Sequence, residues 1–287
     1  MYLRFAIFIS IFTVQVHAVE NIRVIPPQSN YDASHNYFSE LLQLSLDLTS
    51  EEYGAVEIVY STQMEQGRAL FELKRGREID VYWAGTTIER EKELTPIRVP
   101  LVKGLLGFRV SLIRSDRIND FQKVKTLSQL QKMRACQGLH WPDSDILEYS
   151  GIPVKRGPIY ELLFRQLDAG RCDFFPRGLH EAFSEIKARQ HKYADMQLYS
   201  DLIIYYPFPM YFFVGPNDHQ LASRIEKGLN RAIDNGTFLH HMKTHPVTSH
   251  LFPLDQWSNK DIIKLTNPFL AKDTPTHNAR YWFLPNQ

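Results

Sequence analysis

The chain has 287 residues, and its 33 lysines and arginines nearly balance 32 aspartates and glutamates, for a formal net charge of +1. This balance indicates neither nucleic acid nor an anionic membrane as a partner. With 44% hydrophobic and 23% charged residues, the composition excludes disorder as the dominant state, and the length favours two lobes over one. We expect a folded protein and a monomer.

Residues 1–18 have the features of a secretory signal peptide. Arg4 precedes an apolar run from Phe5 to Val16, and Ala18 supplies the small residue of a cleavage site. An uncleaved membrane anchor is the alternative, but the run is shorter than the roughly 20 residues that a spanning helix needs. We expect cleavage after Ala18 and export to the periplasm.

Hydrophobic patterning then predicts two β-α-β-α-β units, each of which implies a parallel sheet. The first unit has expected strands at 21–25, 56–60 and 80–84, and helices at 37–48 and 64–76. The second has expected strands at 134–139, 152–155 and 172–176, and helices at 143–149 and 159–169.

Extended segments at 107–115, 198–206 and 210–214 connect these units. We predict an α/β fold with lobe 1 at 19–108 plus 207–287, and lobe 2 at 109–206. Two hinge strands join the lobes, and the ligand lies in the cleft between them.

Two later segments are less informative. The helix expected at 180–191 is rich in charge and is interpreted as a solvent-facing helix. The segment after His245 is irregular, and its role is not predicted.

Cys136 and Cys172 are the only cysteines. An oxidising compartment favours a disulfide between them, and two buried free thiols are the alternative. Both lie near the starts of strands that are usually neighbours in such a unit, so a bridge is geometrically possible.

One stretch carries the main candidates for ligand binding. The apolar run from Ile79 to Trp83 ends at Gly85, Thr86 and Thr87, and Arg90 follows. Ligands of open α/β sheets lie outside the carboxyl ends of strands, and an arginine fork matches a carboxylate or phosphate. A surface arginine is the alternative. Trp83 and Tyr31 are candidates for stacking on a ligand, although core packing also explains them.

In the second unit, His140 and Trp141 stand between a strand and a helix and are candidates to line the cleft, with ordinary helix capping as the alternative. His241 and His245, near His240 and His250, have a spacing that can bind zinc. No acidic residue or cysteine joins them, so we expect a structural role and predict neither metal nor cofactor.

Four stretches resemble motifs of the bacterial periplasmic solute-binding proteins of the polar amino acid type (family 3). Gly76-Arg77-Glu78-Ile79-Asp80-Val81 is similar to G-x-x-D, and Thr87-Ile88-Glu89-Arg90 to T-x-x-R. Asp234-Asn235-Gly236-Thr237-Phe238 is similar to D-G-T-[YF], and Leu167-Asp168-Ala169-Gly170-Arg171-Cys172-Asp173 to L-x-x-G-[RK]-x-D-A. The resemblance covers about Ile22 to His245.

The resemblance implies a type II periplasmic-binding-protein fold whose cleft closes on its ligand, with Arg90 gripping a carboxylate, supported by Thr87. The sequence departs from the pattern at Gly85, where the family has serine or threonine, and at Gly178, where it has an acid for an α-amino group. Arg177 beside Gly178 either clamps a dianion together with Arg90, latches the lobes, or pairs with a carboxylate such as Glu181.

The expected function is therefore capture of a small anionic or zwitterionic, amino-acid-like molecule, for an inner-membrane ABC permease and without catalysis. One alternative is a sensory module for a membrane receptor. The other is an exported enzyme that uses Asp143, His140 or Glu89 as acid or base.

Overall fold

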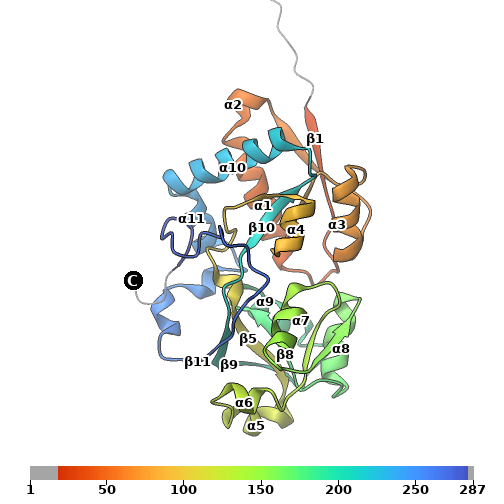
Figure 1. Cartoon of the computed structure of the whole chain (residues 1–287), viewed down its shortest axis with the longest axis vertical. Helices are drawn as coiled ribbons and strands as arrows, with labels where there is room; N and C mark the ends of the chain where they lie inside the picture. The colour runs from red at the N-terminus through yellow and green to blue at the C-terminus, as the bar shows by residue number, and fades with distance from the viewer. Residues whose placement is uncertain (1–18, 284–287) are drawn as a thin grey trace, which may run out of the picture.

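The computed structural model describes residues 19–283, which form two lobes joined by a narrow middle (Figure 1). The expected signal peptide, residues 1–18, lies outside the described residues. Over residues 19–283, no helix has the length and apolar character needed to cross a bilayer.

Lobe 1 contains a parallel pair of strands and an antiparallel group of three. The pair is β1 (Glu20–Val24) and β2 (Val56–Tyr60), with Ile22 opposite Ile58. Strand β10 (Met210–Val214) lies between β3 (Val81–Gly85) and β4 (Thr95–Ile97). Its helices are α1 (Ser34–Asp47), α2 (Ser50–Tyr53), α3 (Gln66–Arg75), α4 (Ile88–Glu93), α10 (His219–Asp234) and α11 (Thr237–Thr244).

Lobe 2 is built on a six-stranded sheet of order β11-β9-β5-β8-β6-β7. These strands are β5 (Phe108–Arg114), β6 (Ala135–Gly138), β7 (Val154–Gly157), β8 (Phe174–Gly178), β9 (Met196–Tyr205) and β11 (Asp261–Lys264). Its helices are α5 (Ile118–Gln122), α6 (Leu127–Leu130), α7 (Pro142–Tyr149), α8 (Tyr160–Asp168) and α9 (Leu179–Arg189). Short 3₁₀ turns are η1 (Leu105–Gly107), η2 (Ser115–Arg117), η3 (Ser249–Leu251) and η4 (Leu254–Trp257).

Parallel pairing is present as β1 with β2, β6 with β7, and β6 with β8. The third strand of the first unit, β3, instead pairs antiparallel with β10. The connections between lobes run from β4 through η1 into β5, and from β9 back into β10. Strands β5 and β9 pair antiparallel to each other, so both crossings lie side by side. This arrangement is the pair of hinge strands that the sequence predicts.

Close helix packing stabilises lobe 1. Tyr37, Leu41 and Leu42 on α1 are fully buried, as the apolar spacing of this helix requires. Helix α10 approaches α1 so closely that a Cβ at Gly228 would lie 1.9 Å from the Ser45 carbonyl oxygen. Glycine is therefore required at this crossing.

The interpretation of residues 180–191 as a solvent-facing helix is wrong. Helix α9 buries His180, Glu181, Glu185 and Arg189. Buried charges persist when they are paired, and these charges have partners on neighbouring elements. The charge pattern is therefore that of an internal network.

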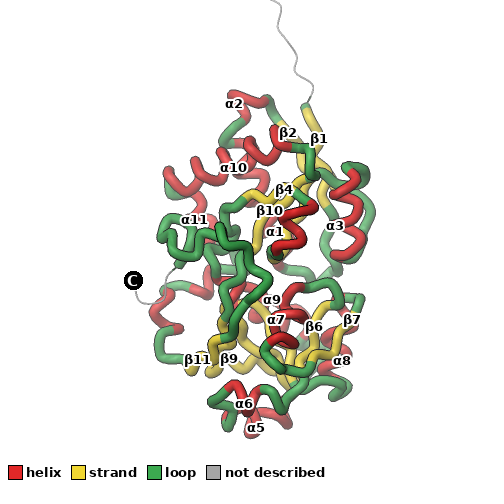
Figure 2. Tube along the Cα trace, viewed as in Figure 1, coloured by secondary structure: helices red, strands yellow, loops and turns green. Residues whose placement is uncertain are grey.

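Residues 252–283, here called the C-terminal strap, run from lobe 1 to lobe 2 and back (Figure 2). Strand β11 pairs in parallel with β9, with Ile262 opposite Ile203. The Phe269 carbonyl oxygen then accepts a hydrogen bond of 2.9 Å from the Ile88 amide of lobe 1. Strand β11 is the outermost strand of the lobe 2 sheet and covers the edge of β9. The predicted assignment of all of 207–287 to lobe 1 is thus wrong for β11.

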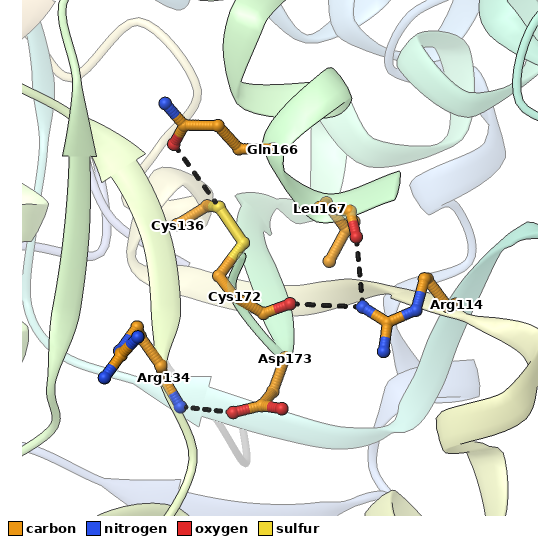
Figure 3. The surroundings of a disulfide bond; sticks show 7 residues. All are labelled: Arg114, Arg134, Cys136, Gln166, Leu167, Cys172 and Asp173. Carbon is orange, nitrogen blue, oxygen red and sulfur yellow. Dashed lines mark hydrogen bonds between the residues drawn. A yellow bond between two sulfur atoms is a disulfide. The ribbon is translucent and has the colours of Figure 1, made fainter. Parts of the chain in front are cut away.

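A disulfide joins Cys136 and Cys172, which confirms the predicted possibility (Figure 3). Cys136 lies on β6 and Cys172 stands two residues before β8, and these strands are neighbours. Their Cα atoms are 5.5 Å apart, a normal distance for a disulfide.

Replacing both cysteines by alanine should lower the free energy of unfolding by roughly 4 kcal/mol, because the bridge closes a loop across a separation of 36 residues. Urea denaturation with and without a reductant measures this. The reductant should destabilise the wild type and leave the double variant unchanged; equal responses would contradict the bridge.

Trp282→Ala should cost about 3–5 kcal/mol, the usual range for a buried tryptophan. Trp282 is only 2% exposed and packs against Gly104, although it belongs to an irregular tail. Phe71→Ala, at a side chain that is 52% exposed, is the matched control and should change stability far less. Equal losses in denaturant melts would show that the strap is not anchored by Trp282.

Candidate ligand-binding site

A cavity of about 90 Å³ lies between the two lobes. A cavity of this volume holds several water molecules, or a small molecule with a few more heavy atoms than these waters. The wall from lobe 1 includes Asp32, His35, Phe38, Gln66, Tyr82, Trp83 and Gly85, and the wall from lobe 2 includes Arg109, Trp141, Asp143, Tyr160, Arg177, Glu181 and Glu185. A molecule bound here would contact both lobes at once.

The lobe 2 wall is a buried network of charges. Arg109, at the start of β5, lies 2.5 Å from Asp143 on α7 and 3.4 Å from Glu181 on α9. Arg177, on β8, lies 3.2 Å from Glu181 and 2.7 Å from Glu185. Three carboxylates therefore pair with two guanidinium groups, which leaves one negative charge in excess, and Glu181 is shared between the two arginines.

Arg177 is held by both charge and aromatic stacking. Its Nε and one terminal nitrogen each donate a hydrogen bond of 2.7 Å to Glu185, a bidentate pair. Its guanidinium carbon lies 4.6 Å from the centre of the Trp141 ring and 5.0 Å from that of Phe175. Arg177 lines the cavity as predicted, but its charge is paired, as in the alternative that gave it a carboxylate partner.

The network shifts the pKa values of two residues on α9. Burial would raise the pKa of Glu181, but the charges of Arg177 and Arg109 lower it to about 2. Burial lowers the pKa of His180 to about 4, so its ring is neutral at pH 7. Neither ring nitrogen of His180 has a hydrogen-bond partner within the described residues.

Asp32 is the unpaired carboxylate of the cavity wall. It precedes α1 and accepts a hydrogen bond of 3.0 Å from the Gln28 amide, but no arginine or lysine within residues 19–283 forms a salt bridge with it. Burial raises its pKa, and the negative charge of Glu185 across the cleft acts in the same direction. A positive group in the cavity would relieve both effects.

Arg90 is the corresponding unpaired cation. It donates hydrogen bonds of 2.6 Å to the Gln66 side chain and to the His140 carbonyl of lobe 2, and a third to the Gly85 carbonyl. These acceptors are neutral, and no carboxylate of the described chain forms a salt bridge with it. Burial lowers its pKa to about 10, so it remains charged at neutral pH. Gln66 and Gly85 separate its guanidinium from the cavity.

The structure brings only part of the predicted set together. Trp83 and Trp141 line the cavity with Arg177. The other predicted residues surround it: the Thr86 hydroxyl donates to Glu91, and Thr87 caps α4 by accepting from the Arg90 amide. The His140 ring packs against Gly67 of lobe 1.

Tyr31 lies at a separate contact between the lobes. Its carbonyl accepts a hydrogen bond of 3.4 Å from Arg189, whose guanidinium also lies 5.5 Å from the Tyr31 ring centre. Arg189 in turn binds Glu161, which accepts a hydrogen bond of 2.6 Å from Ser29. This contact joins the lobes outside the cavity.

The two departures from the family pattern have structural reasons. A Cβ at Gly85 would lie 2.1 Å from the Phe208 ring, which therefore excludes a serine or threonine there. At Gly178, the amide donates a hydrogen bond of 2.9 Å to Glu181. The carboxylate of Glu181, three residues later, thus lies beside position 178, which itself carries no acid.

Sequence reasoning missed Asp32, Arg109 and Glu185. A signal for one of them existed: Arg177, Glu181 and Glu185 follow one another at intervals of four, which places both acids on one face of α9. Asp32 and Arg109 carry no comparable local signal.

The histidine cluster does not assemble a metal site. His241 stacks on Tyr37, and His245 lies 3.8 Å from Glu40. Within the described part of the chain, no group of three or more histidine, cysteine, aspartate or glutamate side chains is placed to hold a metal ion.

Acid should destabilise the protein from about pH 6.5 downward. His180 has an ordinary pKa of 6.5 and a folded pKa of about 4, so between these values the unfolded chain binds a proton that the buried ring does not. The free energy of unfolding therefore falls by up to about 1.4 kcal/mol for each pH unit. Glu181, with a pKa of about 2 against 4.5, adds a second loss below pH 4.5.

His180→Leu should reduce the slope of the stability profile between pH 6.5 and pH 4 and retain the loss below pH 4.5. Burial also lowers the pKa values of His245 and His250, so part of the slope remains. Urea denaturation at several pH values measures both ranges. An unchanged slope above pH 4.5 in the variant would rule out His180 as its source.

Solved structures with the same fold share little sequence with this chain. An ancestral arginine-binding protein bound to arginine has a TM-score of 0.59 and 18% identity, over 80% of this chain and 100% of that chain. A histidine kinase sensor domain with similarity to periplasmic binding proteins has a TM-score of 0.60 and 15% identity, over 80% and 96%. An amino acid ABC transporter substrate-binding protein from Streptococcus pneumoniae has a TM-score of 0.54 and 17% identity, over 74% and 82%.

No protein-family model and no curated protein matches the sequence. The structural likeness over about four-fifths of the chain nevertheless confirms the predicted fold class. The chain has the two-lobe α/β fold of the periplasmic binding proteins.

Proposed function

We propose that the protein is an exported solute-binding protein that captures a small zwitterionic, amino-acid-like molecule between its lobes and delivers it to an ABC-type permease. The observation that carries the proposal is the pair of unbalanced charges at the cleft, the Asp32 carboxylate in the wall and the Arg90 guanidinium behind it. A ligand ammonium would pair with Asp32. A ligand carboxylate would replace Gln66 and Gly85, the acceptors of Arg90 that line the cavity, while the bond from Arg90 to the His140 carbonyl is kept.

Other residues of both walls support the same ligand class. Ser34, His35 and Arg109 line the cavity, and each has a buried polar atom without a hydrogen-bond partner within the described residues. Buried polar atoms are normally satisfied, so a polar ligand suits this space better than an apolar one. Trp83 and Trp141 supply surfaces on which a ligand could stack.

Ligand binding would also favour closure. Arg90 of lobe 1, the residue proposed to hold the carboxylate, already donates a hydrogen bond to the His140 carbonyl of lobe 2. This bond can form only when the two lobes are close together. A ligand that contacts both walls binds the closed form more tightly, and this difference in affinity drives closure.

The neighbouring structures are consistent with binding without catalysis. They include arginine-binding proteins bound to arginine or glutamine and substrate-binding proteins of amino acid transporters. A sensor domain shares the fold, so delivery to a receptor is the second candidate. Deleting the protein should abolish uptake of its solute if it serves a permease, and leave uptake unchanged if it serves a receptor.

Asp32→Asn and Arg90→Gln should each weaken solute binding at least tenfold, which corresponds to about 1.4 kcal/mol. The solute would come from a thermal-shift screen of amino acids, dicarboxylates, polyamines and oligopeptides, and calorimetry would give the affinities. Glu40→Gln and Arg75→Gln, at exposed positions of α1 and α3, are matched controls that should bind as the wild type does.

Unchanged affinity in both cleft variants would refute the zwitterion site. A dicarboxylate as the tightest solute would instead favour the two-arginine clamp.

A further inference from the structure

We infer that Arg177 determines the ligand specificity of the cleft. Its own side chain occupies a subsite that would otherwise suit the cationic side chain of a ligand. The inference rests on the proposed function and adds what the cleft excludes: amino acids with a long, positively charged side chain.

The surroundings of Arg177 have the chemistry of a guanidinium-binding site. Glu185 presents both carboxylate oxygens to the guanidinium at 2.7 Å, and the Tyr160 hydroxyl fixes this carboxylate through a hydrogen bond of 2.6 Å. The Trp141 and Phe175 rings flank the cation. A bidentate carboxylate beside aromatic faces is how proteins recognise a guanidinium group.

This subsite belongs to the cleft and not to the remote core. Arg177, Trp141, Tyr160 and Glu185 all line the cavity between the lobes. They also all lie in lobe 2, on β8, α8 and α9 and next to α7, so the subsite stays filled when the lobes separate. A ligand entering the open cleft therefore meets the subsite already occupied.

The charges left for a ligand are correspondingly few. Asp143, Glu181 and Glu185 each pair with Arg109 or Arg177, which leaves Asp32 as the carboxylate of the cavity wall without a guanidinium partner in the described chain. A second positive group on the ligand would approach the Arg177 charge in the remaining 90 Å³. Like charges in a confined site reject a ligand, so small zwitterions are preferred.

The experiment removes the internal guanidinium and supplies one from solution. Arg177→Ala should melt at a lower temperature than the wild type, because it leaves the Glu185 carboxylate buried and unpaired. Methylguanidinium at about 10 mM should raise the melting temperature of this variant and not that of the wild type. Methylammonium should act more weakly, because it cannot form the bidentate pair.

The double variant Arg177→Ala/Glu185→Gln is the matched control. It lacks the unpaired charge, so it should be more stable than Arg177→Ala and should not respond to methylguanidinium. If Arg177→Ala alone fails to fold, Arg177→Gln, which keeps most of the side-chain volume, is compared with the same double control. Equal responses of wild type, single and double variants would overturn the subsite.

A second measurement tests specificity with L-arginine as the probe. The wild type should show no binding at millimolar concentration, and Arg177→Ala should bind at least tenfold more tightly than the wild type by calorimetry. Tight binding of L-arginine to the wild type would overturn the exclusion while leaving the proposed solute-binding function in place. Conversely, failure of the wild type to bind any solute in the screen would refute that function without affecting the methylguanidinium response.

Discussion

The cleft depends on keeping five charges buried together. Arg109, Asp143, Arg177, Glu181 and Glu185 are each at most 7% exposed. A single buried charge without a partner costs several kcal/mol, so each of the elements that carry them must hold its position relative to the others. The network therefore gives lobe 2 a rigid wall. In the proposed function, lobe 1 supplies the unpaired groups and lobe 2 supplies a surface whose shape does not change on binding.

The C-terminal strap adds a connection that a two-strand hinge does not require. Strand β11 is part of the lobe 2 sheet, whereas Phe269 and Trp282 contact lobe 1. Between them, the Leu265 amide donates to the Tyr205 carbonyl, and the Asn267 side chain donates to the Pro207 carbonyl at 2.9 Å. The strap thus follows the β9–β10 crossing closely. A segment that bends at the same place as the hinge permits rotation of the lobes, while its anchors at both ends oppose their separation.

The sequence predicted those features that depend on local patterns. Hydrophobic patterning located α1 and α8, and the order of strands brought Cys136 beside Cys172. Prediction from the sequence failed for features that depend on contacts between residues far apart in the chain. The charges of α9 looked solvated because their partners on β5 and β8 cannot be read from the helix alone, and β11 has only four residues whose strand character comes from pairing with β9. Propensity is a weak guide under such tertiary control.

A carboxylate lies beside Gly178, although position 178 itself carries no acid. Glu181 folds back to the Gly178 amide, so a carboxylate lies close to the position where the family has its acid. That carboxylate is shared by Arg177 and Arg109, and their charges hold its pKa at about 2. An ammonium at this point would have to compete with two guanidinium groups. Asp32 has no guanidinium or ammonium partner within the described residues, and burial and the charge of Glu185 raise its pKa, so a nearby cation would stabilise its charged form. In the proposed function, lobe 1 therefore recognises the ammonium through Asp32, and the Glu181 carboxylate of lobe 2 supports Arg177.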